Sequence, residues 1–137
     1  HKLKSEYVGL TGPEIVALKK EGVEITDRVE IPLVAFLGDT APADYSALPC
    51  VAQAKVLLIE CTFFEDEHRD RARQGKHLHV HDLPGILEGM KNERIVLIHV
   101  TRRTNLGFAR KQLKALLDKS VLARVSFLMD RKHMEAE

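Results

Sequence analysis

Long hydrophobic runs are absent from this chain of 137 residues. No apolar stretch approaches the roughly 20 residues that a membrane-spanning helix requires, and no signal-peptide pattern is present. An excess of charge is also lacking, because 21 Lys and Arg residues oppose 20 Asp and Glu residues. The net charge of +1 creates no overall field that attracts nucleic acid or an anionic membrane. We therefore expect no membrane partner, and any basic surface must be local.

Cysteine is scarce as well. Cys50 and Cys61 are too far apart for a Cys-x-x-Cys element, and no disulfide framework is implied. A reducing, cytoplasmic location fits this usage best. The sequence also lacks repeats and low-complexity tracts, and 45% of it is hydrophobic, as in ordinary globular proteins. This length suits one domain with a real core, so we expect residues 1–137 to form a single domain.

Three short apolar runs form the organising pattern of the sequence. Runs of this length bounded by turn residues are typical of strands buried in a parallel sheet. The predicted strands cover residues 33–37, 55–59 and 94–99. The first leads to Asp39, the second to Glu60, and the third ends at His99. Because ligands of such sheets bind beyond the carboxyl ends of the strands, we expect these side chains at one rim, as in a metal or acid–base site.

Helical patterns separate the predicted strands. Thr11 caps a first helix that Gly22 ends. Residues 42–48 suit one or two helical turns, which Pro49 closes. The further predicted elements are helices at residues 63–74, 82–90 and 106–118 and a closing strand at residues 121–129. Alternating strands and helices indicate an α/β layered fold with a largely parallel or mixed sheet.

Asp39 and His99 each allow two interpretations. A hard carboxylate at a strand end suits zinc or manganese and can bridge two such ions. Alternatively, Asp39 caps the turn that Gly38 begins. A neutral imidazole at the position of His99 can bind a metal through one nitrogen while an acceptor holds the other. Alternatively, His99 is a hydrogen-bonded histidine at the edge of the core. The residues alone leave these alternatives open.

A histidine cluster follows the second strand. His77, His79 and His81 alternate, so in an extended segment they would share one face and could chelate a metal. A carboxylate such as Glu60 that orients an imidazole produces a general acid, because the pair fixes the tautomer and stabilises the protonated ring. The alternative is a polar loop in which the histidines are incidental.

A local basic patch follows the third strand. Arg102 and Arg103 lie in a Thr-Arg-Arg-Thr segment, and residues 110–114 add one arginine and two lysines. Together they could hold phosphate beside His99. A solvated helix face explains residues 110–114 equally well. Arg102 and Arg103 are the better candidates because they follow the candidate metal ligand directly.

Four motifs, taken in chain order, carry a family resemblance. They are Phe36-Leu37-Gly38-Asp39-Thr40, Leu57-Leu58-Ile59-Glu60-Cys61-Thr62-Phe63, His77-Leu78-His79 and Leu97-Ile98-His99-Val100-Thr101-Arg102-Arg103. The set resembles the latter part of ribonuclease Z, the tRNA 3′-processing endonuclease of the metallo-β-lactamase superfamily. The resemblance covers roughly residues 2–117. Its specificity comes from the combined order, spacing and strand context of the motifs.

The resemblance implies a role for each matched residue. Asp39 matches a bridging metal ligand, and His99 matches the last metal-binding histidine. Glu60 matches the glutamate of the family's His-Glu-Ala-Thr motif, and His77 matches the histidine that it orients to protonate the leaving oxygen. The candidate contacts to phosphate or substrate are Thr62, His79, Arg102 and Arg103. The implied cofactor is zinc, as two ions in the complete enzyme, with manganese as the alternative.

Three local features depart from the family pattern. Ile59 stands where the His-Glu-Ala-Thr motif has histidine, and Cys61 stands where it has alanine. Residues 100–104 read Val-Thr-Arg-Arg-Thr instead of a segment of the Phe-Ser-Pro-Arg-Tyr type. These differences favour a divergent ribonuclease Z-like hydrolase.

The largest departure is the absence of the superfamily's His-x-His-x-Asp-His motif. The resemblance implies a four-layer αβ/βα sandwich of two similar halves, and this motif belongs to the N-terminal half. We therefore interpret residues 1–137 as the C-terminal half, an α/β unit with a mixed sheet flanked by helices. It would belong to a metal-dependent hydrolase of phosphodiesters such as tRNA 3′ ends. We expect the chain alone to be catalytically incomplete.

Two other interpretations remain at this point. The first is a non-catalytic half-domain that forms a homodimer or binds RNA through the basic patch. The second is an α/β domain in which Asp39, Glu60 and His99 never converge.

Overall fold

The computed structural model describes residues 1–130, and residues 131–137 lie outside this range. The chain packs as two compact units, His1–Ile31 and a second unit that begins at Pro32. The expectation that residues 1–137 form a single domain therefore stays a prediction. Each unit has its own secondary-structure elements.

The first unit is a short two-stranded element with one helix. Strands β1 (Lys2–Leu3) and β2 (Thr26–Asp27) pair in antiparallel fashion. Helix α1 (Gly12–Lys20) begins where Glu14 accepts hydrogen bonds from the backbone N–H and the hydroxyl of Thr11, at 2.7 and 2.6 Å. These bonds satisfy a donor at the helix start, as the sequence predicts. A 3-10 turn, η1 (Ser5–Tyr7), precedes the helix.

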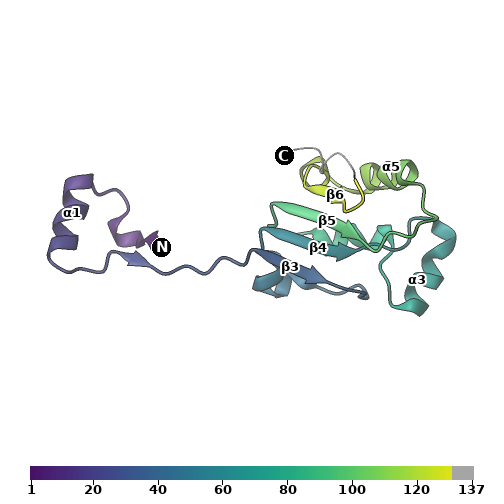
Figure 1. The fold of residues 1–137 in the computed structure, drawn as a ribbon, viewed down its shortest axis with the longest axis horizontal. Coiled ribbons are helices and arrows are strands. Elements are labelled where there is room, and N and C mark those ends of the chain that lie inside the picture. The colour runs from purple at the N-terminus through teal and green to yellow at the C-terminus, as the bar shows by residue number, and fades with distance from the viewer. Residues whose placement is uncertain (131–137) are drawn as a thin grey trace. The chain divides into compact units, whose positions relative to one another are not determined.

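A four-stranded sheet forms the centre of the second unit (Figure 1). Its strands are β3 (Val34–Leu37), β4 (Val56–Glu60), β5 (Arg94–Ile98) and β6 (Val125–Phe127). They lie in the order β3-β4-β5-β6, and every neighbouring pair is parallel. The predicted α/β class is confirmed. All four carboxyl ends point the same way, so residues that follow the strands gather at one edge.

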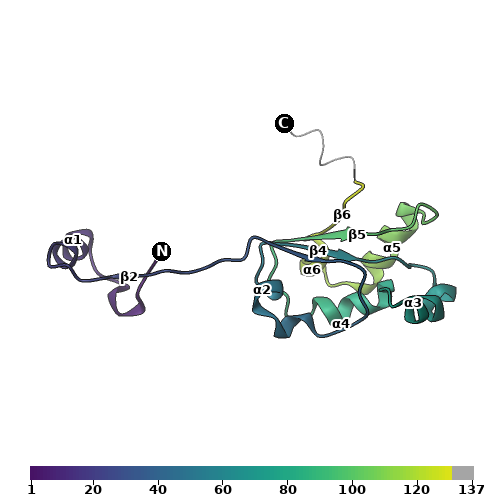
Figure 2. The ribbon, with the colours of Figure 1, turned by 60° about the horizontal axis from the view of Figure 1, so that its bottom comes forward.

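Helices connect the strands and lie on one side of the sheet (Figure 2). They are α2 (Pro49–Ala52), α3 (Arg69–Gly75), α4 (Leu83–Leu87), α5 (Leu106–Leu116) and α6 (Lys119–Leu122). Three 3-10 turns join them, η2 (Tyr45–Ala47), η3 (Asp66–His68) and η4 (Val80–Asp82). Within residues 1–130, no helix is long and apolar enough to cross a membrane.

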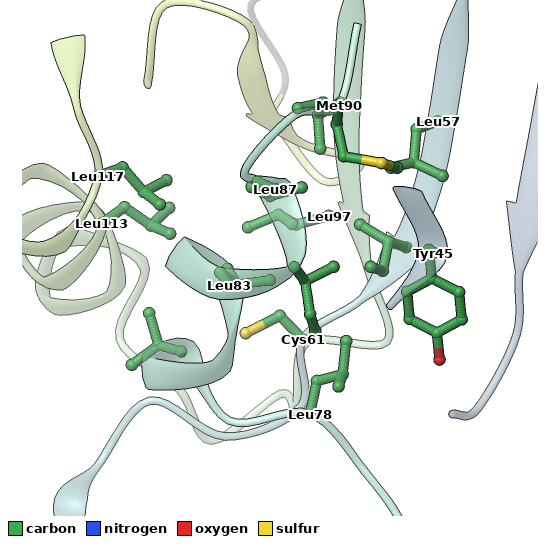
Figure 3. Close-up of a cluster of buried hydrophobic side chains, with 14 of the residues drawn as sticks. Tyr45, Leu57, Cys61, Leu78, Leu83, Leu87, Met90, Leu97, Leu113 and Leu117 are labelled. Carbon is green, nitrogen blue, oxygen red and sulfur yellow. The ribbon is translucent and has the colours of Figure 1, made fainter. Parts of the chain in front are cut away.

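The core lies between this helical layer and one face of the sheet (Figure 3). Leu57 and Ile59 of β4 and Leu97 of β5 are at most 1% exposed and face the helices. Leu83 of α4 and Leu113 of α5 pack against them. Each fully buried side chain of this size stabilises the fold by about 1.5–3 kcal/mol. The alternation of buried and open residues along the strands follows the two-residue period of the pleat.

The other face of the sheet is apolar but open. Val34 and Phe36 of β3 are 60% and 67% exposed. Across the sheet, Phe36 stands beside Leu58, which stands beside the partly exposed Val96. Within residues 32–130, no helix covers this face (Figure 2). The sheet thus carries hydrophobic side chains on both faces and buries only one.

Three element predictions are wrong. Pro49 does not close the turns before it but opens α2, where its missing N–H removes no helical hydrogen bond. Residues 121–129 do not form one strand, because α6 extends to Leu122 and β6 has three residues. The helix predicted from residue 63 begins later, because Phe63 forms a parallel bridge with His79 and α3 starts at Arg69.

Candidate metal and acid–base site

The carboxyl ends of three neighbouring strands bring the predicted site residues to one edge. Asp39 follows β3 by two residues, Glu60 ends β4, and His99 follows β5. Glu60 stands in register with Ile98, the residue before His99. This is the convergence that the apolar runs predict. The interpretation in which these side chains never meet is therefore wrong.

Asp39, His77 and His99 form one cluster. One ligand atom from each lies within 4.8 Å of those of the other two. Nδ1 of His99 is 3.4 Å from Oδ1 of Asp39, and the rings of His77 and His99 have centroids 5.1 Å apart. The side chains are 65%, 22% and 48% exposed in the order Asp39, His77, His99, so the cluster is open to solvent.

Glu60 lies beneath this cluster and is fully buried. Its Oε1 accepts hydrogen bonds from Nδ1 of His77 at 2.9 Å, from the Leu78 N–H at 3.1 Å and from the Thr40 N–H at 3.2 Å. Its Oε2 accepts one from the Thr62 hydroxyl at 2.7 Å. A buried carboxylate needs such hydrogen-bond partners, because burying a charge without them costs a large amount of folding free energy. Glu60 therefore joins β4 to the segments that carry His77 and Asp39.

Thr62 links Glu60 to His99 and fixes the tautomer of the ring. Its hydroxyl oxygen lies 2.9 Å from Nδ1 of His99. The hydroxyl has one proton, which it donates to the carboxylate, and an ionised carboxylate only accepts. Nδ1 of His99 therefore donates to Thr62, and Nε2 keeps a free lone pair. By the same logic, Nδ1 of His77 donates to Glu60 and leaves Nε2 free in the neutral ring.

The backbone at His99 is unusual. Its φ of +57° lies in the left-handed region, which few residues other than glycine adopt. Lys76, which caps the C-terminal end of α3 directly before His77, has a φ of +55°. Backbone strain of this kind gathers at functional sites, where the surrounding structure holds it in place. His99 thus lies at a left-handed backbone position, and His77 directly follows one.

The donor set fits a divalent metal ion. Two imidazole nitrogens and one carboxylate oxygen are ligands that zinc takes in proteins. In both His77 and His99 the hydrogen bond at Nδ1 leaves Nε2 free, as is common in metal-binding histidines. Asp39 and one histidine of the cluster therefore have the composition of a partial metal site, and a histidine that does not bind the ion is free for acid–base chemistry.

The histidines at 77, 79 and 81 do not share one face, as an extended segment would require. His79 is 3% exposed, and its Nε2 lies 3.0 Å from the Glu65 carbonyl oxygen. It caps η4, so the chain coils at Val80 and brings His81 within 3.3 Å of His79. His79 and His81 form a separate group with Asp66. Partial burial, and then the nearby Arg69 charge, lower the pKa of His81.

The predicted basic patch also divides. Arg110 pairs with Asp130 and stacks 5.7 Å from the ring centre of Phe127. Arg102 and Arg103 are exposed and line an open pocket beside Phe63 instead. Four more lining residues escaped the sequence interpretation: Phe63, Glu65, His68 and Arg71. Phe63 directly follows Thr62 in the strand-end motif, which is the signal that could have identified it.

Comparisons with known proteins place this geometry in context. The chain is 43% identical over 120 residues to tRNase Z TRZ1 of Arabidopsis thaliana, a match that covers 85% of this chain and 42% of the relative. It is 32% identical over 122 residues to the chloroplastic tRNase Z TRZ2 of the same plant, covering 86% of this chain and 34% of the relative. The chain thus spans less than half the length of these relatives. No family model matches it.

A solved structure supports the fold. The metallo-beta-lactamase fold protein YhfI from Bacillus subtilis superposes with a TM-score of 0.52 at 18% identity. The superposition covers 69% of this chain and 35% of that protein. At this identity the likeness concerns the fold alone.

Proposed function

Because this chain is ribonuclease Z-like and belongs to the metallo-β-lactamase superfamily, we propose that it forms the C-terminal half of a metal-dependent phosphodiesterase that processes tRNA 3′ ends. The observation that carries the proposal is the convergence of Asp39, His77 and His99 above the buried carboxylate of Glu60. Convergent polar groups of this kind at strand ends are typical of hydrolytic sites.

Asp39 and His99 are the proposed metal ligands, and zinc is the proposed metal, with manganese as the alternative. His99 suits this role because Thr62 occupies Nδ1 and leaves Nε2 free. When bound, the metal would activate water and polarise the phosphodiester. In the superfamily, the His-x-His-x-Asp-His motif of the other half supplies most of the ligands. We therefore propose that the chain alone binds metal weakly and hydrolyses little.

His77 is the proposed general acid. Glu60 accepts a hydrogen bond from its Nδ1 at 2.9 Å, so Nε2 is left free and can carry a proton to the leaving oxygen. The buried carboxylate would stabilise the protonated ring, since Nδ1 of His77 donates a hydrogen bond directly to it. Glu60 itself is 0% exposed and acts as a positioning residue.

Arg102 and Arg103 remain the proposed phosphate contacts, because both are exposed beside the cluster. Thr62 and His79 receive a different proposal. They are only 5% and 3% exposed, and their polar atoms already bond Glu60, His99 and the Glu65 carbonyl. We assign both a positioning role in place of a substrate contact.

Four further features are part of the same proposal. Both cysteines are free, which supports a reducing compartment such as the cytoplasm. RNA is the proposed substrate, and the relatives do not favour a non-catalytic module. A homodimer stays a prediction that sedimentation velocity can test. The assignment of residues 1–137 to one C-terminal half-domain can be tested by limited proteolysis.

Metal content and hydrolysis test the function. The chain, loaded with zinc and dialysed, should retain less than one ion by plasma emission, and Asp39→Asn should reduce the retained amount further. Asp70→Asn serves as a matched control, since Asp70 is 87% exposed and belongs to neither group of candidate metal ligands. The chain extended to the full length of its relatives should hydrolyse bis-p-nitrophenyl phosphate and lose this activity in His77→Ala. Strong zinc-dependent hydrolysis by the 137-residue chain would overturn the proposed incompleteness.

A further inference from the structure

An open pocket of about 470 Å³ lies beside the candidate site. It forms between the segment that leads from β4 into α3 and the loop that follows β5. The residues that line it are Phe63, Glu65, His68, Arg71, Thr101, Arg102, Arg103 and Thr104. Its size falls within the range of small-molecule and nucleotide sites in proteins. The roles proposed above use only two of these residues.

A series of aromatic rings leads from this pocket to the metal and acid–base cluster. His68 and Phe63 have ring centroids 5.6 Å apart, and Phe63 and His77 have centroids 6.2 Å apart. His77 in turn lies 5.1 Å from His99. Phe63 is partly exposed and belongs to the pocket lining, so part of its ring is open to an occupant. Anything that stacks on Phe63 would lie next to the proposed general acid.

The charge of the pocket favours an anion. Three arginines line it, and the single lining carboxylate, Glu65, lies 3.3 Å from Nδ1 of His68. On α3, Arg69 pairs with Asp66, whereas Arg71 has no carboxylate within 4.0 Å among residues 1–130. Guanidinium groups bind phosphate by paired hydrogen bonds and also stack on flat rings.

From this combination we infer that the pocket binds an unpaired RNA nucleotide next to the scissile bond. Its base stacks on the Phe63 ring, and its flanking phosphates contact Arg71, Arg102 and Arg103. An aromatic surface in a positively charged groove is the usual way in which proteins hold single-stranded nucleic acid. An acidic peptide would use the arginines but gain nothing specific from the ring. The inference rests on the proposed function, because it assigns a binding pocket to one nucleotide of the RNA substrate proposed for that site.

Binding of a short RNA, without catalysis, tests the inference. The probe is a fluorescein-labelled oligoadenylate of about five nucleotides, a length within the range that single-strand-binding folds occupy, titrated by anisotropy with the 137-residue chain in EDTA. Phe63→Leu should weaken binding about tenfold, as expected for the loss of one base stack. Phe108→Leu is the matched control, because Phe108 is also partly exposed but lies outside the pocket. It should leave the affinity unchanged.

The salt dependence gives a second readout. Arg71→Gln should reduce the slope of log affinity against log salt by about 0.7, the value for one phosphate contact with a single strand. Arg73→Gln on the same helix should not change it, since Arg73 is 80% exposed and lies outside the pocket lining. Both arginine positions are exposed, so these variants test binding without disturbing the core.

Each outcome has a defined consequence. Equal affinities for Phe63→Leu and Phe108→Leu, or equal slopes for the two arginine variants, would overturn the inference. Displacement of the probe by oligoglutamate as effectively as by an unlabelled oligoadenylate of equal charge would also overturn it, in favour of an acidic peptide. Since EDTA removes the metal, loss of RNA binding says nothing against hydrolysis. Conversely, a full-length protein that binds no metal would refute the proposed function while nucleotide binding persists.

Discussion

Replacing Glu60 by glutamine tests the network that holds the candidate site. Three of the four hydrogen bonds to Glu60 end on Oε1, and the bond from Thr62 ends on Oε2. An amide with its oxygen at the Oε1 position keeps the first three. Its NH₂ group then faces the Thr62 hydroxyl and donates to it. The hydroxyl proton must turn toward Nδ1 of His99, so His99 should change to the tautomer protonated at Nε2.

The magnitudes separate Glu60→Gln from Glu60→Ala. Glutamine loses charge assistance in its bonds but relieves the cost of burying a charge, so we expect a loss of about 1 kcal/mol in the free energy of unfolding. Alanine leaves the buried Leu78 N–H without an acceptor, at about 1–3 kcal/mol, and also removes the acceptor of the Thr40 N–H. With the cavity included, we expect a loss of about 4 kcal/mol for alanine. Glu88→Gln, at an exposed position, should change nothing.

Two measurements check these expectations. Urea unfolding gives the free energies, and long-range ¹H–¹⁵N correlation spectra report which nitrogen of His99 is protonated. The reasoning predicts an Nδ1-protonated His99 in the native chain and an Nε2-protonated one in Glu60→Gln. If glutamine destabilises the fold as much as alanine does, or if the tautomer of His99 stays the same in both proteins, the described network does not orient the ring.

Three further predictions concern other parts of the second unit. His99→Gly should be more stable to urea than His99→Ala by about 1 kcal/mol, because only glycine adopts a φ of +57° without strain. Asn92→Leu should lose about 3 kcal/mol in the same assay, because the buried amide donates two hydrogen bonds to backbone carbonyls at 2.8 and 2.7 Å. Burial, and then the Glu60 charge, raise the pKa of the Cys61 thiol well above its usual value, so a disulfide reagent should modify the exposed Cys50 rapidly and Cys61 only on unfolding. Below the pKa of the unfolded thiol, about 8.5, Cys61 is neutral in both states and the free energy of unfolding should not depend on its ionisation. As the pH rises from there toward the folded pKa, the free energy of unfolding should fall, because only the unfolded thiol ionises.

The sequence predicted the positions of the candidate residues better than their surroundings. The apolar runs before Asp39, Glu60 and His99 are strong signals of buried parallel strands. A polar residue at the end of such a strand must lie at the carboxyl edge of the sheet. The hydrogen bond between Glu60 and His77 agrees with the orientation that the resemblance implies. The roles of these residues remain predictions.

Other features depend on contacts that no local pattern encodes. His79 was grouped with His77 because they alternate, but a bridge to Phe63 and the turn at Val80 direct the two rings to different places. The resemblance implies that Thr62 contacts substrate, yet its hydroxyl bonds Glu60, two residues away, and His99, which is 37 residues away in sequence. Pairing between segments far apart along the chain decides such cases.

The open face of the sheet has a thermodynamic consequence. The denaturant m-value and the heat capacity of unfolding both scale with the surface that unfolding newly exposes. Phe36 and Val34 are already mostly in contact with water, so unfolding gains little from them. The chain should therefore show a smaller m-value and heat-capacity change than a globular unit of equal length. Any surface that comes to cover β3 and β4 would raise both quantities without altering a single bond within the site.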